Sequence, residues 1–166
     1  MNHCCVIVAG GSHARFFTLE DAGVPELESG PRLVELRDLI NPEHKAHEGT
    51  LWSSGKAGRN RAPGGGAAHG YDDHREQHGE EFERRFARDI AEEATRLVKS
   101  HNTQHVILVA QKRMLGLLRI ALDPLLKAGV NVQEFATDLG KLPPQDLHAH
   151  LSRQHLLPPC RRHTAG

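Results

Sequence analysis

The stretch CCVIVAGGSHARFFTL, residues 4–19, decides how this chain begins to fold. Its first six residues, CCVIVA, are apolar and include β-branched side chains, which is typical of a buried central strand. After the four residues GGSH, the run ARFFTL at 14–19 has the same character. A link this short favours pairing of the two strands as an antiparallel hairpin.

The same patterns predict further strands and helices downstream. Turn-forming residues crowd positions 21–31, so we expect a third strand at Leu33–Ile40, which Asn41-Pro42 ends. Apolar residues recur at helical spacing from about Asp73 to Ser100, which predicts the longest helix of the chain. The other expected elements are a strand at His105–Ala110, a helix at Arg113–Leu122, a helical turn that Asp123-Pro124 begins and Gly129 ends, a strand at Val130–Thr137 and a helix at Pro143–Leu151.

This order of elements predicts a single α/β domain with a mixed sheet. Three early strands joined by short links favour an antiparallel meander, whereas the later strand-helix-strand unit requires a parallel, right-handed crossover. A chain of 166 residues has room for one real core rather than two comfortable ones. We expect a domain at 1–152 with a long, flexible, glycine-rich loop at about 52–72, and a disordered tail at 153–166.

Composition limits the classes of function. Lys and Arg together number 21, as do Asp and Glu, so no global field draws the protein towards nucleic acid or an acidic membrane. The three cysteines, Cys4, Cys5 and Cys160, have neither the spacing of a disulfide framework nor that of a zinc site. The apolar run near the N-terminus is too short for a signal peptide or a membrane span. We therefore expect a cytoplasmic protein with no membrane span.

Two glycine-containing stretches look like nucleotide-binding loops but lack the required chemistry. GTLWSSGKAG, from Gly49, fails as a P-loop because five residues separate Gly49 from Gly55. In addition, Ala57 stands where a hydroxyl would have to reach magnesium. The glycines at 64–66 do not complete a dinucleotide fingerprint, because His69 replaces the third glycine.

Histidines are unusually frequent, and the 13 of them make the net charge sensitive to mild acidification. His74 and His78 would share one face at the start of the long helix, as paired metal ligands do. The sequence implies no third ligand, so the favoured interpretation is solvated histidines, with no metal and no cofactor.

A local positive stretch runs from Gly49 to Tyr71, with three cations and no carboxylate: Lys56, Arg59 and Arg61. A flexible cationic segment of this kind can follow a phosphate backbone, although a solvated linker has the same composition. Lys112 and Arg113 extend this candidate RNA-binding set, since they follow a predicted strand whose carboxyl end is where open α/β sheets bind ligands.

Several stretches together resemble the bacterial family of host attachment proteins, which are required for attachment to host cells. The resemblance spans Cys4 to about Leu151. It rests on VIVAGGSHARFF (6–17), NPEHKAHEGTLWSSGKAGR (41–59), EEFERRFARDIAEEATR (80–96), HVILVAQKRMLGLLRIAL (105–122) and DLGKLPPQDLHAHL (138–151). The family takes its name from a phenotype, so the resemblance implies no particular reaction.

That family is in turn similar to the catalytic middle domain of archaeal and eukaryotic translation release factors, which implies an RNase H-like sheet here. In that domain a Gly-Gly-Gln loop precedes the long helix and enters the peptidyl-transferase centre. Gly64, Gly65 and Gly66 occupy the corresponding point, but Ala67 and Ala68 follow where glutamine is required. Ala67 could offer only a backbone amide to a reacting ester, so conventional peptide release lacks its positioned side chain.

Three functions are compatible with these patterns. The first is an RNA- or ribosome-associated module that uses the basic glycine-rich loop, with the ribosome or tRNA as partner. The second is a non-catalytic interaction factor in surface or host-cell attachment, in which the loop binds a protein partner. The third is a hydrolase of unknown substrate, metal-assisted through the histidines. The sequence carries no signal for an oligomeric state.

Overall fold

The computed structural model describes residues 4–24, 27, 29–41 and 68–161, and within α2 it describes side chains from Glu80 onward. The elements, in chain order, are β1 (Cys4–Ala9), β2 (His13–Glu20), β3 (Arg32–Ile40), α2 (Ala68–Ser100), β4 (His105–Ala110), α3 (Lys112–Leu122), β5 (Asn131–Ala136) and α4 (Pro144–Arg153). Apart from the start of α2, each lies within a few residues of the segment that the sequence predicts for it.

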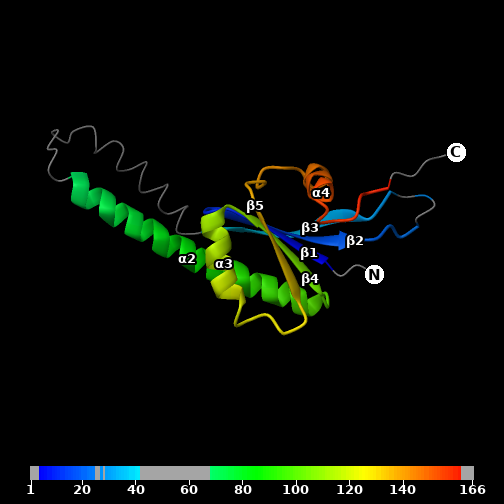
Figure 1. The fold of residues 1–166 in the computed structure, drawn as a ribbon, viewed down its shortest axis with the longest axis horizontal. Coiled ribbons are helices and arrows are strands. Elements are labelled where there is room, and N and C mark those ends of the chain that lie inside the picture. Colours follow the sequence, from blue (N-terminus) through cyan, green and yellow to red (C-terminus); the bar gives the residue numbers. More distant parts are fainter. Residues whose placement is uncertain (1–3, 25–26, 28, 42–67, 162–166) are drawn as a thin grey trace.

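The strands form one mixed sheet in the order β3-β2-β1-β4-β5 (Figure 1). β1 pairs antiparallel with β2, where Val6 lies opposite Phe17, and β2 pairs antiparallel with β3. On its other side β1 lies parallel to β4, with Ile7 opposite Leu108, and β5 continues the parallel half. The predicted meander followed by a parallel crossover is therefore confirmed, and the chain is a single α/β domain.

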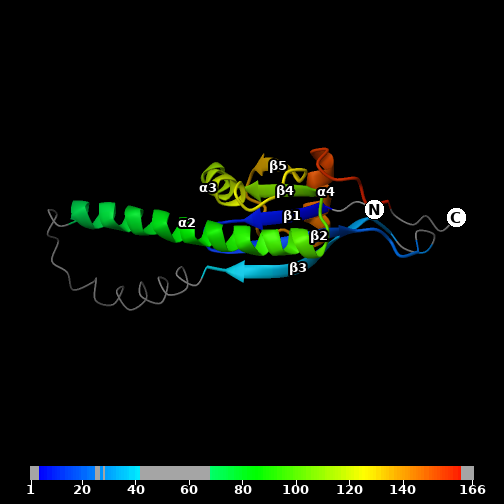
Figure 2. The same ribbon diagram turned by 90° about the horizontal axis from the view of Figure 1, so that it is seen from below.

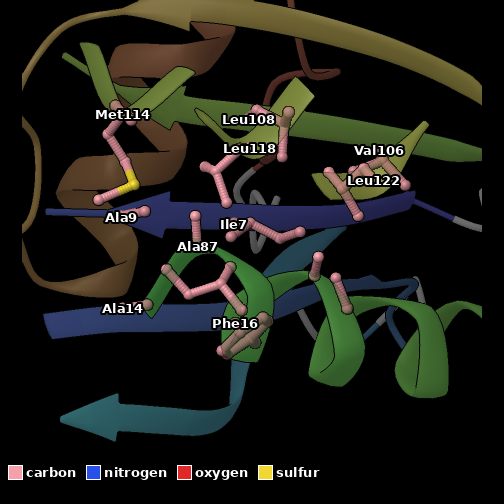
Figure 3. Packing of buried hydrophobic residues seen from close by; sticks show 14 of the residues in the cluster. Ile7, Ala9, Ala14, Phe16, Ala87, Val106, Leu108, Met114, Leu118 and Leu122 are labelled. Carbon is pink, nitrogen blue, oxygen red and sulfur yellow. The ribbon is translucent and has the colours of Figure 1, made fainter. Parts of the chain in front are cut away.

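Side chains that alternate along β1 supply two hydrophobic cores, one on each face of the sheet. On one face, Ile7 lies in a cluster with Ala87 of α2 and Leu118 of α3 (Figure 3). On the other face, Val6 lies in a cluster with Leu147 of α4. Helices thus cover both faces of the sheet, which explains why β1 is buried at every position rather than at every second one.

Helix α2 is the longest described helix, with 33 residues, and the structure confirms its predicted apolar face. Phe86 and Ile90 are 1% and 0% exposed and pack against the sheet. The helix begins at Ala68 rather than near Asp73, so residues 68–72 of the predicted loop are helical. Its N-terminal part extends beyond the sheet (Figures 1 and 2). Among the described helices, none combines the length and apolar character that crossing a membrane requires.

The connection after α3 differs from the predicted helical turn. Asp123 ends α3 with helical backbone angles, φ −51° and ψ −50°, whereas an N-cap residue needs an extended conformation. Leu125 and Leu126 both donate their backbone N–H groups to the carbonyl of Leu122, which closes a turn and starts no new helix. Gly129 lies in the next turn at φ +105°, where the absence of a Cβ avoids strain.

The segment 153–161 is not the disordered tail that the sequence predicts. Leu157 is 5% exposed and joins the hydrophobic cluster that α4 forms with the sheet. Arg161 exchanges two backbone hydrogen bonds with Gly30, just before β3. The prediction failed because one buried leucine and one backbone bridge leave no periodic pattern in a sequence.

Candidate functional site

A polar cleft of about 370 Å³ lies where the carboxyl ends of β1 and β4 meet. β1 has an antiparallel neighbour on one side and a parallel neighbour on the other, so the chain connections diverge at this edge. Such an edge is where open α/β sheets bind ligands. We call this feature the strand-end cleft. It is lined by Val8, Ala9, Gly10, Gly11, Ser12, His13, Arg15, Glu83, Gln111, Arg113, Met114, Asp138, Gly140 and Lys141.

The glycine turn between β1 and β2 forms one rim of the strand-end cleft and holds the end of β3. Gly10 closes the turn by donating its N–H to the carbonyl of His13 at 2.8 Å. Asn41, which is 3% exposed, donates its side-chain amide to the carbonyl of Gly11 at 3.2 Å and its backbone N–H to that of Ser12 at 2.9 Å. Residues 42–67 follow Asn41 directly, so the chain enters that segment from the rim of the cleft.

Arg15 of β2 fixes the opposite rim. Its guanidinium donates to both carboxylate oxygens of Glu35, at 2.9 and 3.2 Å, and lies 4.8 Å from the centre of the Phe17 ring. It also donates to the carbonyls of Leu142, at 2.6 Å, and Gly140, at 3.3 Å, in the loop after β5. With its donors used in this way, Arg15 positions that loop and is not a free cation.

Arg113, in the first turn of α3, is paired with two carboxylates of α2. Its guanidinium lies 3.0 Å from Glu83 and 3.4 Å from Glu80. The pairs join α3 to the part of α2 that precedes its first buried residue, Phe86, among the side chains described. Arg113 therefore holds α2 against the cleft, and its charge is largely balanced within the protein.

Two lysines contribute the exposed cations near this edge. Lys112 and Lys141 are exposed, and neither forms an ion pair with any residue of the described part of the chain. His13 lies 3.4 Å from Asp38, and Asp138 accepts a hydrogen bond from the N–H of Gly140. The arrangement offers hydrogen-bond donors and two exposed positive charges to a polar ligand. Within the described residues, no group of three or more His, Cys, Asp or Glu side chains could hold a metal ion.

The structure brings some of the predicted site residues together and leaves others outside its description. Lys112 and Arg113 lie at the carboxyl end of β4, and Arg113 lines the cleft. Lys56, Arg59 and Arg61, together with Gly64, Gly65, Gly66 and Ala67, lie outside the described residues. His74 and His78 are in α2, and their side chains lie outside the described part.

Sequence analysis missed most of the cleft residues that come from other elements. Arg15, Glu83 and Asn41 meet there only because β2, α2 and the end of β3 converge in three dimensions. The residue types of Arg15, Glu83 and Asn41 and their spacing in the sequence match no binding motif. Gln111 and Asp138 each directly follow the end of a predicted strand, and the rule that ligands bind at such ends could have found them.

These observations define the class of the protein: an α/β domain with helices on both faces of a mixed sheet and a polar cleft at the carboxyl ends of its parallel strands. The family described as "Protein required for attachment to host cells" matches residues 5–151. The match covers most of the chain, and the protein belongs to that family. None of the curated proteins compared with this chain matches it.

Proposed function

We propose that this member of the host attachment family is an RNA-binding module that associates with the ribosome or tRNA in the cytoplasm. The cationic stretch Gly49–Tyr71 supplies the phosphate contacts, and the strand-end cleft holds a polar part of the same ligand. The observation that carries the proposal is the binding of Asn41, whose side-chain amide and backbone N–H hold the end of β3 at the rim of the strand-end cleft, eight residues before Gly49 in the sequence.

The charge distribution supports RNA rather than a general attraction to anions. The chain has no net charge, so a long-range field cannot drive the binding. Lys56, Arg59 and Arg61 are concentrated in one stretch without carboxylates. Three such cations can neutralise about three phosphates, which is enough to make binding depend clearly on salt concentration.

Peptide release of the conventional kind is not part of the proposal. The similarity to the middle domain of release factors suggests a loop that approaches the ribosome, and the three glycines before α2 agree with it. Ala67 stands where a glutamine side chain would be needed. The proposed activity is therefore binding, with the glycine stretch allowing the loop to follow RNA closely.

A pull-down from cell lysate tests the proposal. The full chain should retain ribosomal RNA or tRNA at low salt and lose it at high salt. Replacing Lys56, Arg59 and Arg61 together by alanine should abolish retention. The matched control replaces Arg84, Arg88 and Lys99, which are exposed cations of α2, and should retain RNA as the parent does. Retention of RNA by the first triple variant would refute the proposal.

The description of the family as required for attachment to host cells favours a second function, a non-catalytic interaction factor in that attachment. In that case the same segment would bind a protein partner. The pull-down separates the two, because a protein partner would be retained by the parent chain after ribonuclease treatment and an RNA-bridged one would not.

A further inference from the structure

Two arginines line the strand-end cleft, and their ion pairs differ in how firmly they are held. The Arg15 side chain is 11% exposed, and its guanidinium donates to both carboxylate oxygens of Glu35. Arg113 is 58% exposed, and its approaches to Glu83, at 3.0 Å, and to Glu80, at 3.4 Å, are ion pairs without that bidentate bonding. Exposed ion pairs are weak. Arg113 is therefore the arginine of the cleft that can exchange its partner.

The carboxylate of Glu83 lies between α3 and the glycine turn, on the border of the cleft. Its Oε2 atom is 3.0 Å from Nε of Arg113. Its Oε1 atom lies beside the turn, since a Cβ added at Gly11 would be 3.8 Å from it. A carboxylate thus occupies the space in which a bound anion would contact both Arg113 and the turn.

Glu83 can leave this position without disturbing the core. Its side chain is 29% exposed, and within the described part of the chain Arg113 is its ion-pair partner. The first buried side chain described in α2, Phe86, comes three residues later. A phosphate group pairs with a guanidinium through two parallel hydrogen bonds, so it can replace the carboxylate with better geometry.

The other carboxylate among the described lining residues does not hold Arg113. Asp138 accepts a hydrogen bond from the backbone N–H of Gly140 at 3.2 Å, in the loop after β5. Glu80 pairs with Arg113 but does not line the cleft. Glu83 is therefore the cleft carboxylate that decides whether Arg113 is available to a ligand.

We propose that Glu83 is a built-in competitor for the cleft, and that a phosphate of the RNA reaches Arg113 only by displacing it. This inference rests on the proposed RNA binding and names the residue that limits it. Displacement exchanges one anion for another on the same guanidinium, so the exchange alone gains little. It succeeds for a phosphate that other contacts of the RNA already hold nearby, because those contacts raise its effective concentration. The cleft thereby discriminates RNA from free phosphate.

The affinity of the full-length protein for a short labelled single-stranded RNA tests the proposal. Glu83→Gln keeps the shape of the side chain and removes its charge. It should strengthen binding about fivefold at low salt, which is the worth of one exposed ion pair. It should also steepen the plot of log affinity against log salt concentration by about 0.7, because one phosphate contact is added. Glu92→Gln removes an exposed charge of α2 away from the cleft and should match the parent.

A second variant shows whether the gain acts through Arg113. Arg113→Gln alone should change RNA affinity less than about twofold, because in the parent the phosphate merely replaces Glu83. The double variant Glu83→Gln with Arg113→Gln should lose the gain and return to the affinity of the parent. Thermal unfolding close to that of the parent would establish that the variants are folded. The same gain in the double variant as in Glu83→Gln would overturn the inference.

Inorganic phosphate separates this inference from the proposed function. Added at constant ionic strength, phosphate should shift the amide resonances of Gly10, Gly11 and Arg113 in Glu83→Gln, and should leave those of the parent and of Glu92→Gln nearly unchanged. This pattern without RNA binding by any variant would support the role of Glu83 and refute RNA as the ligand. RNA binding by the parent, with Glu83→Gln identical to it towards both probes, would refute the role of Glu83 and leave RNA binding in place.

Discussion

At the scale of single residues, two arginines at the strand-end cleft show that a cation's role depends on its contacts. The Arg15 guanidinium donates hydrogen bonds to Glu35 and to two backbone carbonyls. Arg113 forms ion pairs with Glu80 and Glu83. Neither is free to attract a phosphate, although Arg113 follows a strand end as a ligand-binding residue would. Lys112 and Lys141 are the exposed alternatives at this edge in the described structure.

The buried thiols give a first prediction. Burial raises the pKa of Cys4 from 9.0 to about 11, and burial together with the neighbouring Cys4 raises that of Cys5 to about 12, while Cys160 is exposed. Because the thiolate is the reactive form, only Cys160 should react with a disulfide reagent in the native protein near pH 8. In denaturant, Cys4 and Cys5 should react as well, because unfolding exposes their thiols. Spectrophotometric thiol counting with and without guanidinium measures this.

The control for the thiol experiment is Cys160→Ser, which should show no native reaction. The raised pKa values also fix the sign of the pH dependence. Above about pH 9 the unfolded thiols ionise while the folded ones stay protonated, so the stability that the two thiols contribute is lost as pH rises from 9 through about 11 for Cys4 and about 12 for Cys5. Rapid native reaction of two or more thiols would contradict the burial of Cys4 and Cys5.

The core face of α2 gives a second prediction. Ile90 is 0% exposed in the cluster between α2 and the sheet, so Ile90→Ala should lower the free energy of unfolding by about 2–5 kcal/mol. Phe86→Ala should lower the free energy of unfolding by a comparable amount. Ile120→Ala is the matched control, because Ile120 is 74% exposed and should change stability by less than about 0.5 kcal/mol. Equal midpoints of urea unfolding for the two isoleucine variants would refute the packing.

At the scale of elements, the sequence predicts every described strand and helix to within a few residues, with one large exception at the start of α2. The strands at Cys4–Ala9 and His105–Ala110 are recognisable because they are short and apolar on both faces. α2 begins at Ala68, before its apolar pattern, since the projecting part has no core to cover. A helix already nucleated can extend without an amphipathic face, so that boundary leaves no trace in periodicity.

The contact between α2 and α3 gives a third prediction. Arg113→Ala should change global stability by less than about 1 kcal/mol, because its ion pairs are partly exposed. It should nevertheless speed amide hydrogen exchange over residues 80–86, because α2 loses its ion pairs with α3 there. Arg119→Ala, which breaks the pair with Glu134 elsewhere on α3, should leave that exchange unchanged. Identical exchange in the Arg113 variant and the parent would exclude the role assigned to Arg113.

The C-terminal segment gives a fourth prediction. Leu157→Ala should lower the free energy of unfolding by about 2–5 kcal/mol, since Leu157 is 5% exposed within the core under α4. Leu27→Ala makes the same change at a side chain that is 73% exposed, and should cost less than about 0.5 kcal/mol. Chemical denaturation compares the two. A negligible effect at Leu157 would restore the view of residues 153–161 as an unstructured tail.

At the scale of the whole molecule, hollows lie at both ends of the strands. The strand-end cleft lies at the carboxyl ends of β1 and β4, and a second hollow, lined by the start of β3, by α4 and by Pro159 and Cys160, lies at the opposite end of β3. The sequence predicts the first of these in outline, through the rule for strand ends. It does not predict the second, because β3, α4 and residues 159–160 are far apart in the chain and come together only on folding.

The most direct test of the RNA-binding proposal is the salt dependence of affinity for labelled tRNA and for a short single-stranded RNA. For the full chain, a plot of log affinity against log salt concentration should fall with a slope of about −2 on the single strand, as expected for three phosphate contacts. The variant that lacks Lys56, Arg59 and Arg61 should lose that slope and bind far more weakly, while the variant that lacks Arg84, Arg88 and Lys99 should match the parent. Binding of equal strength and slope in both variants, or no binding by the parent at low salt, would contradict the account.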